Sequence, residues 1–279
     1  MPYSAEISRT NPTCFLFLLD QSGSMNDPFG SGESTKRKAD GVADAINKLL
    51  QNLVIKCARD TGIYDYFHIG IVGYGVSVGS AWAGALAGQE LVPISDVGNN
   101  PARVEERGKK VDDGAGGLIE QKVKFPVWFD PVASGGTPMC QALNYSKSIL
   151  AKWNSQHPNS YPPLVINITD GEATDGDPLS AADGLRGLES SDGPALLFNL
   201  HLSSTNASPI TFPDNEAGLP DQYAQALFRM SSVMPPQMRS QAAADGFAVG
   251  ETSKGYVFNA DLVSLVQFLD IGTRPSNLR

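Results

Sequence analysis

The sequence predicts an α/β fold in which a doubly wound, mostly parallel sheet is flanked by helices. Short apolar runs at 14–19, 67–74, 164–169 and 195–202 are typical of strands buried inside a parallel sheet. Segments with helical spacing of apolar residues lie between them, so strands and helices alternate along the chain. Ligands of such sheets bind beyond the carboxyl ends of the strands, which is where a functional site is expected.

The individual elements follow from local patterns. The clearest helix signal follows a loop rich in Gly, Ser and Asp at 26–34, because Val42, Ile46, Leu49 and Leu53 recur at helical spacing. Pro126 places the run at 122–130 on a sheet edge. Thr137 followed by Pro138 matches a helix N-cap. Further helices are expected at 137–153, 180–188, 221–230, 237–244 and from Asp261, and a further strand at 255–259.

Chain length permits one domain spanning residues 1–279, and no linker divides it. Two segments look longer than a minimal α/β fold needs. The segment at 75–122 is rich in glycine and is expected to be a partly ordered insertion with a short hairpin or helix. A second long loop lies at 203–220. Both are candidates for partner-specific surfaces.

Composition limits the possible partners and the compartment. A formal net charge of −9 argues against nucleic acid, and the run Lys36-Arg37-Lys38 is expected to be a solvated helix face. Cys14, Cys57 and Cys140 show no paired spacing, so free thiols in a reducing compartment are expected. Neither a secretory signal nor a run of membrane-spanning length is visible, so we expect a cytoplasmic protein.

One motif organises the chain. Asp20, Ser22 and Ser24 follow the first apolar strand as Asp-x-Ser-x-Ser, and small oxygen side chains on one turn suit a hard cation such as Mg²⁺. Thr137 lies in a Gly-Gly-Thr-Pro turn, and Asp170 ends another apolar strand in Ile-Thr-Asp-Gly. In this order the three pieces resemble the metal-ion-dependent adhesion site (MIDAS) of von Willebrand factor A (vWA) domains, a Rossmann-like fold. The resemblance covers most of the chain, from about Thr13 to Ile271.

The resemblance implies a role for each residue. Ser22 and Ser24 would bind Mg²⁺ through their hydroxyls, and Thr137 would bind directly or through water. Asp20 and Asp170 would act through waters and hydrogen bonds. Mn²⁺ or Ca²⁺ could replace Mg²⁺. Mostly neutral ligands leave the ion electrophilic, so that an Asp or Glu of a partner can take one of its six positions. Such binding is not hydrolysis, and no enzymatic activity is expected.

Intracellular vWA proteins commonly work in multiprotein assemblies, which implies a function as an adaptor or regulatory subunit. Partners of this class include AAA+ ATPases, and kinases or phosphatases in bacterial stress-response or anti-phage systems; no membrane partner is expected. The layout is similar to that of tellurite-resistance-associated vWA proteins. A Mg²⁺-dependent phosphohydrolase of haloacid-dehalogenase-like type is the alternative, although Ser22 stands where that scheme needs a second carboxylate. A metal-free vWA scaffold is a third hypothesis.

Several residues have a second interpretation. The two serines and Asp170 also suit simple turns, and the Thr137 hydroxyl also suits a helix cap. The acidic loop after Asp170 could bind a second ion, raise cation affinity, repel acidic partners or simply be solvated. Met25 could contact a partner at the rim or pack beneath the turn. The histidines have no paired spacing for zinc. The acidic residues are Glu172, Asp175 and Asp177, and the histidines are His68, His157 and His201.

Overall fold

The computed structural model describes residues 2–28, 36–112, 118–202 and 208–273. An eight-stranded, mixed sheet forms its centre, with strand order β13-β14-β12-β9-β1-β4-β5 and with β6 also paired to β4. Five strands run parallel and confirm the predicted α/β class: β1 (Thr13–Asp20), β4 (Phe67–Tyr74), β9 (Leu164–Thr169), β12 (Leu196–Leu202) and β14 (Tyr256–Ala260). The short strands β5 (Val78–Ser80), β6 (Val92–Pro93) and β13 (Ile210–Thr211) are antiparallel to their neighbours.

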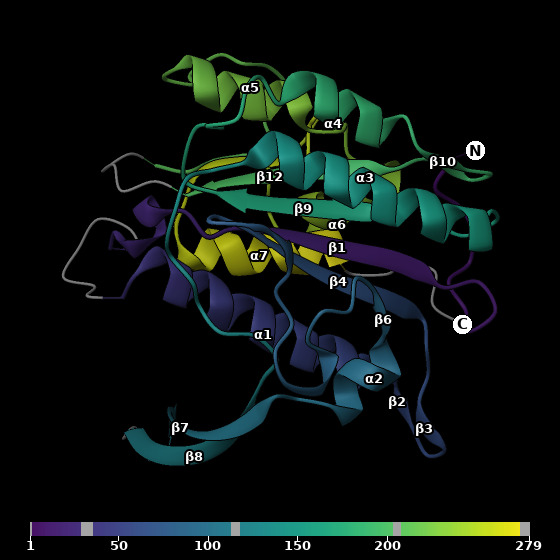
Figure 1. The fold of residues 1–279 in the computed structure, drawn as a ribbon, viewed down its shortest axis with the longest axis vertical. Helices are drawn as coiled ribbons and strands as arrows, with labels where there is room; N and C mark the ends of the chain where they lie inside the picture. Colours follow the sequence, from purple (N-terminus) through teal and green to yellow (C-terminus); the bar gives the residue numbers. More distant parts are fainter. Residues whose placement is uncertain (1, 29–35, 113–117, 203–207, 274–279) are drawn as a thin grey trace.

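Helices cover both faces of the sheet, as Figure 1 shows for α3, α4 and α5 on one side and α1 and α7 on the other. The helices are α1 (Lys38–Cys57), α2 (Ile94–Asn99), α3 (Met139–Gln156), α4 (Leu179–Arg186), α5 (Gln222–Met230), α6 (Pro236–Ala244) and α7 (Leu262–Thr273). Single 3₁₀ turns form η1 (Gly23–Asn26) and η2 (Gly84–Leu86). Among the described residues, no helix has the length and apolar character to cross a membrane.

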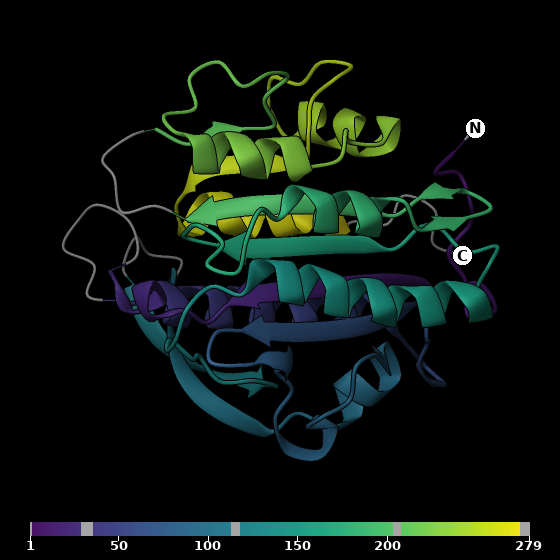
Figure 2. The ribbon, with the colours of Figure 1, turned by 45° about the horizontal axis from the view of Figure 1, so that its top comes forward.

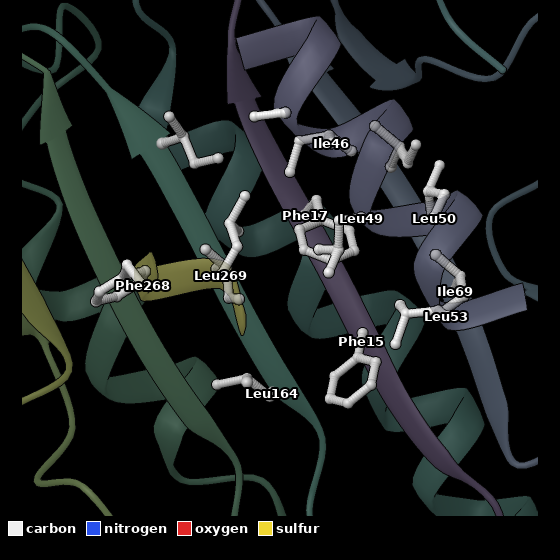
Figure 3. Packing of buried hydrophobic residues seen from close by; sticks show 14 of the residues in the cluster. Phe15, Phe17, Ile46, Leu49, Leu50, Leu53, Ile69, Leu164, Phe268 and Leu269 are labelled. Carbon is white, nitrogen blue, oxygen red and sulfur yellow. The ribbon is translucent and has the colours of Figure 1, made fainter. Parts of the chain in front are cut away.

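The central strand β1 is buried over its whole length and divides the core in two. Phe15 and Phe17 lie on the face covered by α1 and α7, in one cluster with side chains such as Leu49 of α1 and Phe268 of α7 (Figure 3). Alternate residues such as Leu16 pack on the opposite face with α3, α4 and α5. This alternation follows from the two-residue period of a strand. Each fully buried large apolar side chain stabilises the fold by about 1.5–3 kcal/mol.

The segment at 75–122 contributes more regular structure than the sequence indicated. Its first half supplies β5, η2, β6 and α2, and two of these elements extend the main sheet beside β4. Its second half enters a long antiparallel hairpin of β7 (Arg103–Asp112) and β8 (Leu118–Val127), which lies apart from the main sheet (Figures 1 and 2). Residues 113–117, and 203–207 of the second long loop, lie outside the described residues.

Two further hairpins are small, β2–β3 (Ala58–Arg59 with Gly62–Ile63) and β10–β11 (Glu189–Ser190 with Gly193–Pro194). The sheet register decides where the site lies. Asp20 is aligned with Tyr74, and Leu19 with Ile168, so β1 and β9 end at the same level. The residues that follow these two strands therefore leave the sheet side by side.

Candidate metal centre

Asp20 is held in place at the carboxyl end of β1. Asp20 is only 2% exposed to solvent. One oxygen, Oδ1, accepts a hydrogen bond from the backbone N–H of Ser22 at 2.8 Å, and Oδ2 accepts one from the Thr169 hydroxyl at 2.7 Å. Burial raises the pKa of the Asp20 carboxyl, and nearby Asp170 adds to this, whereas the hydrogen bonds from Ser22 and Thr169 lower it. Both oxygens are thus oriented by partners within the molecule.

The turn that carries Ser22 and Ser24, called the serine turn below, connects Asp20 to Asp170 through hydrogen bonds. Ser22 precedes η1 and is buried, whereas Ser24 lies within η1 and is exposed. Their hydroxyl oxygens are 3.0 Å apart, and the Ser24 hydroxyl donates to Asp170 Oδ1 at 2.7 Å. Met25 is 1% exposed and packs in the core beneath the turn, which decides between its two interpretations. Four of the five predicted metal-site residues therefore form one hydrogen-bonded cluster.

The fifth residue, Thr137, lies in a loop that is tied to this cluster two residues earlier, at Gly135. The N–H of Gly23 donates to the carbonyl of Gly135 at 3.0 Å, which ties the Thr137 loop to the serine turn. Gly135 has φ +91°, and a Cβ there would lie 2.6 Å from the backbone nitrogen of Val76. Only glycine fits this approach. Thr137 is 5% exposed, and its N–H donates to the Thr174 hydroxyl at 2.9 Å.

The expectation that Thr137 caps the following helix is wrong. Helix α3 begins at Met139, and Pro138, the residue before it, offers no side-chain acceptor. Asp175 supplies the cap from a distant loop, because its carboxylate accepts from the N–H groups of Cys140 at 3.0 Å and Gln141 at 2.9 Å. This leaves the Thr137 hydroxyl outside the capping hydrogen bonds.

Lys38 belongs to the site, although the run Lys36-Arg37-Lys38 was expected to be a solvated helix face. Its Nζ lies 2.8 Å from Asp170 Oδ2, and the two side chains are only 5% and 0% exposed. The carboxylate of Asp27 lies farther from it, at 3.9 Å. Lys38 precedes Val42 by four residues and Ile46 by eight, so helical spacing already placed it on the buried face of α1. That spacing is the signal that could have identified it.

The acidic loop has structural functions that the sequence did not reveal. Asp175 caps α3, and Asp177 Oδ1 accepts the N–H of Leu179 at 3.0 Å at the start of α4. Glu172 is exposed. No histidine hydrogen-bonds to the cluster among the described residues: His68 Nδ1 accepts from Trp153 Nε1 at 2.7 Å, and His201, which is aligned with Thr169 in the sheet, stacks on an aromatic ring of β14.

The donor set fits a hard divalent cation. Asp20 and Asp170 supply two buried carboxylates, of which Asp170 pairs with the buried ammonium of Lys38, and the hydroxyls of Ser22 and Ser24 lie along the hydrogen-bonded path from one carboxylate to the other. Formally this leaves one negative charge in excess, which a cation would compensate. Within the described parts of the chain, no group of three or more His, Cys, Asp or Glu side chains is arranged to hold a metal. A centre here would therefore depend on hydroxyl ligands, which suit Mg²⁺.

Comparisons with known proteins add little to this geometry. No family model and no curated protein matches the chain. Among solved structures, proximal thread matrix protein 1 from the mussel byssus is 12% identical with a TM-score of 0.47, over 96% of this chain and 48% of that one. The vWF domain of the pilus tip protein Mfa5 from Porphyromonas gingivalis is 14% identical with a TM-score of 0.32, over 58% and 39%. The pilus adhesin RrgA from Streptococcus pneumoniae is 12% identical with a TM-score of 0.31, over 96% and 38%. The chain spans less than half the length of each of these proteins.

Proposed function

We propose that this chain is a metal-dependent protein-interaction module of vWA type that binds an acidic side chain of a partner. Ser22, Ser24 and Thr137 would hold Mg²⁺, with Asp20 and Asp170 accepting hydrogen bonds around it. The observation that carries the proposal is the cluster of Asp20, Ser22, Ser24 and Asp170 at the ends of β1 and β9. When bound, the ion would supply an electrophilic position for a carboxylate.

The spacing of the serine oxygens supports this assignment. Mg²⁺ holds its oxygens at about 2.0–2.1 Å in an octahedron, so neighbouring ligands lie about 2.9 Å apart. The hydroxyl oxygens of Ser22 and Ser24 are 3.0 Å apart, close to that separation. The hydrogen bond between them would then give way to metal coordination without a large movement of either side chain.

The phosphohydrolase alternative fits the geometry less well. In that scheme the aspartate after the first strand attacks phosphorus, and so must reach its substrate. Asp20 is 2% exposed, and each of its oxygens accepts a hydrogen bond within the protein. Ser22 supplies no second carboxylate to act as acid and base. The arrangement thus favours binding over catalysis.

We place the module in the cytoplasm, supported by three free cysteines, of which Cys14 and Cys57 are buried. A function as an adaptor or regulatory subunit of a bacterial stress-response or defence complex rests on the vWA resemblance. A partner of the AAA+ ATPase, kinase or phosphatase class rests on the same resemblance.

Calorimetry with Mg²⁺, Mn²⁺ and Ca²⁺ tests the metal centre. We expect the wild type to bind Mg²⁺, and Ser22→Ala to lose at least tenfold in affinity while keeping its unfolding midpoint. Ser148→Ala is the matched control, because Ser148 is an exposed serine on α3. Pull-downs from the native host with and without EDTA then test partner binding. Wild-type protein that binds no divalent cation, or a partner retained equally in EDTA and by Ser22→Ala, would refute the proposal.

A further inference from the structure

A cavity of about 400 Å³ opens beside the candidate metal centre, between the acidic loop and α5. Its lining includes Gly171, the residue after Asp170, and Met139, two residues after Thr137. The cavity therefore begins where two of the site loops end. Its volume lies in the range that receives a single side chain or a small ligand. None of the functions described above uses it.

The floor of the cavity is apolar. Met139 and Leu227 are 1% and 3% exposed and belong to the core between the sheet and α5. Tyr223, on the first turn of α5, lines the wall and is 38% exposed. An aliphatic stem lying on this floor would be removed from water, and each square ångström of apolar surface buried would favour binding by about 25 cal/mol.

The rim of the cavity is acidic. Glu172 and Asp177 both line it and are exposed, whereas none of the described lining residues is Lys, Arg or His. Within the described parts of the chain, neither carboxylate forms an ion pair with a Lys or Arg. The hydrogen bond from Leu179 N to Asp177 Oδ1 orients that side chain and leaves Oδ2 for a ligand. The cavity thus complements a long apolar stem that ends in a positive charge.

We propose that this cavity binds an arginine side chain of the partner segment whose acidic residue binds at the metal centre. The proposal rests on the proposed function. Arginine fits better than lysine because its planar fork offers several donors to a carboxylate rim, and because it is less strongly hydrated and stacks on aromatic rings such as Tyr223. Successive residues of an extended segment are about 3.3 Å apart, so the two side chains would come from nearby positions. The recognised chemistry is then an acidic residue with an arginine a few residues away.

Methyl NMR tests the cavity without any metal. The probes are N-acetyl-arginine amide, the corresponding lysine amide and the norleucine amide, titrated against protein with labelled methionine methyl groups. Met139 reports on the floor, assigned with Met139→Leu, and Met25 beneath the serine turn is the internal control. We expect the arginine amide to shift Met139 with at least fivefold higher affinity than norleucine, and to leave Met25 unchanged.

The double variant Glu172→Gln with Asp177→Asn is expected to remove this preference for arginine. Both substitutions remove a charge at nearly constant shape, and the amide oxygen introduced at position 177 can still accept the hydrogen bond from Leu179 N. Equal affinity for arginine and norleucine in the wild type, or a preference that survives in the double variant, would overturn the proposal. Lysine amide binding as tightly as arginine amide would overturn the assignment to arginine.

A second titration uses hexapeptides carrying one Glu and one Arg, with Mg²⁺ or EDTA. Tighter binding in Mg²⁺ than in EDTA supports both sites. Arginine binding that persists with no effect of Mg²⁺ would refute the metal-dependent function and leave the cavity assignment intact.

Discussion

Replacing Lys38 by methionine removes the only ammonium within 4 Å of Asp170 among the described residues, and keeps a similar side-chain volume. At 2.8 Å, with an effective dielectric constant near 20, the Coulomb attraction of the pair is about 6 kcal/mol. Desolvation of both groups offsets part of this attraction. Removing one partner of a buried ion pair therefore costs about 3–5 kcal/mol. We expect Lys38→Met to lower the free energy of unfolding by that amount in metal-free buffer.

The same substitution should raise the affinity for Mg²⁺. A divalent cation next to Asp170 would restore the missing positive charge, and whatever stability it restores appears as tighter binding. If bound Mg²⁺ restores even a third of the stability that Lys38→Met loses, the dissociation constant for Mg²⁺ falls about tenfold relative to the wild type. Urea unfolding with and without Mg²⁺ measures the first effect, and calorimetry measures the second.

Lys36→Met is the matched control for this experiment. Lys36 Nζ lies 2.6 Å from Asp44 Oδ2, but the side chains are 36% and 32% exposed. Such an exposed pair contributes about 0–1 kcal/mol. If Lys38→Met destabilises the metal-free protein no more than Lys36→Met, or leaves Mg²⁺ affinity unchanged, Lys38 is not the counter-charge of the site.

Three further predictions concern the surroundings of the site. Asp175→Ala should cost about 0.5–2 kcal/mol in urea unfolding through loss of the α3 cap, and no change would show the cap to be dispensable. Gly135→Ala should lower the free energy of unfolding more than Gly88→Ala does. Both glycines have positive φ, but a Cβ at Gly135 would clash with the backbone of Val76, whereas a Cβ at Gly88 would have nothing within 4 Å. Equal effects of the two substitutions would exclude the predicted clash. Burial lowers the pKa of His201 to about 4 from 6.5, so the unfolded chain binds the proton first and stability is lost as pH falls from 6.5 to 4. His201→Phe should remove up to about 2.4 kcal/mol of that loss between pH 7 and 4.5, and an unchanged pH dependence of the urea midpoint would contradict this.

Much of the fold could be predicted because it depends on local patterns. The continuous apolar run of β1 and the helical spacing on α1 identify those elements without any tertiary information. The sequence placed the starts of two helices at Asp221 and Asp261, and both residues cap those helices through hydrogen bonds from Ala224 N and Ser264 N. Where an element is stabilised by its own sequence, the sequence was sufficient.

The errors arose where partners lie far apart in the chain. The start of α3 is set by Asp175, which lies 35 residues after Cys140, so nothing near Thr137 could show that its hydroxyl is not the cap. Lys38 meets Asp170 across 132 residues, and a run of three basic residues suggested solvent instead. Position within the helical period was the better guide, because it showed which of the three points inward.

The long hairpin offers a practical use that follows from how it closes. Arg103 pairs with Val127 at its base, and ten paired positions run from there to Asp112 and Leu118. Because the two chain ends meet at the base, the outer pairs can be trimmed, or a reporter protein grafted in their place, without moving β1 or β9. A tagged or shortened protein of this kind would provide a tool for finding partners while the candidate centre stays untouched.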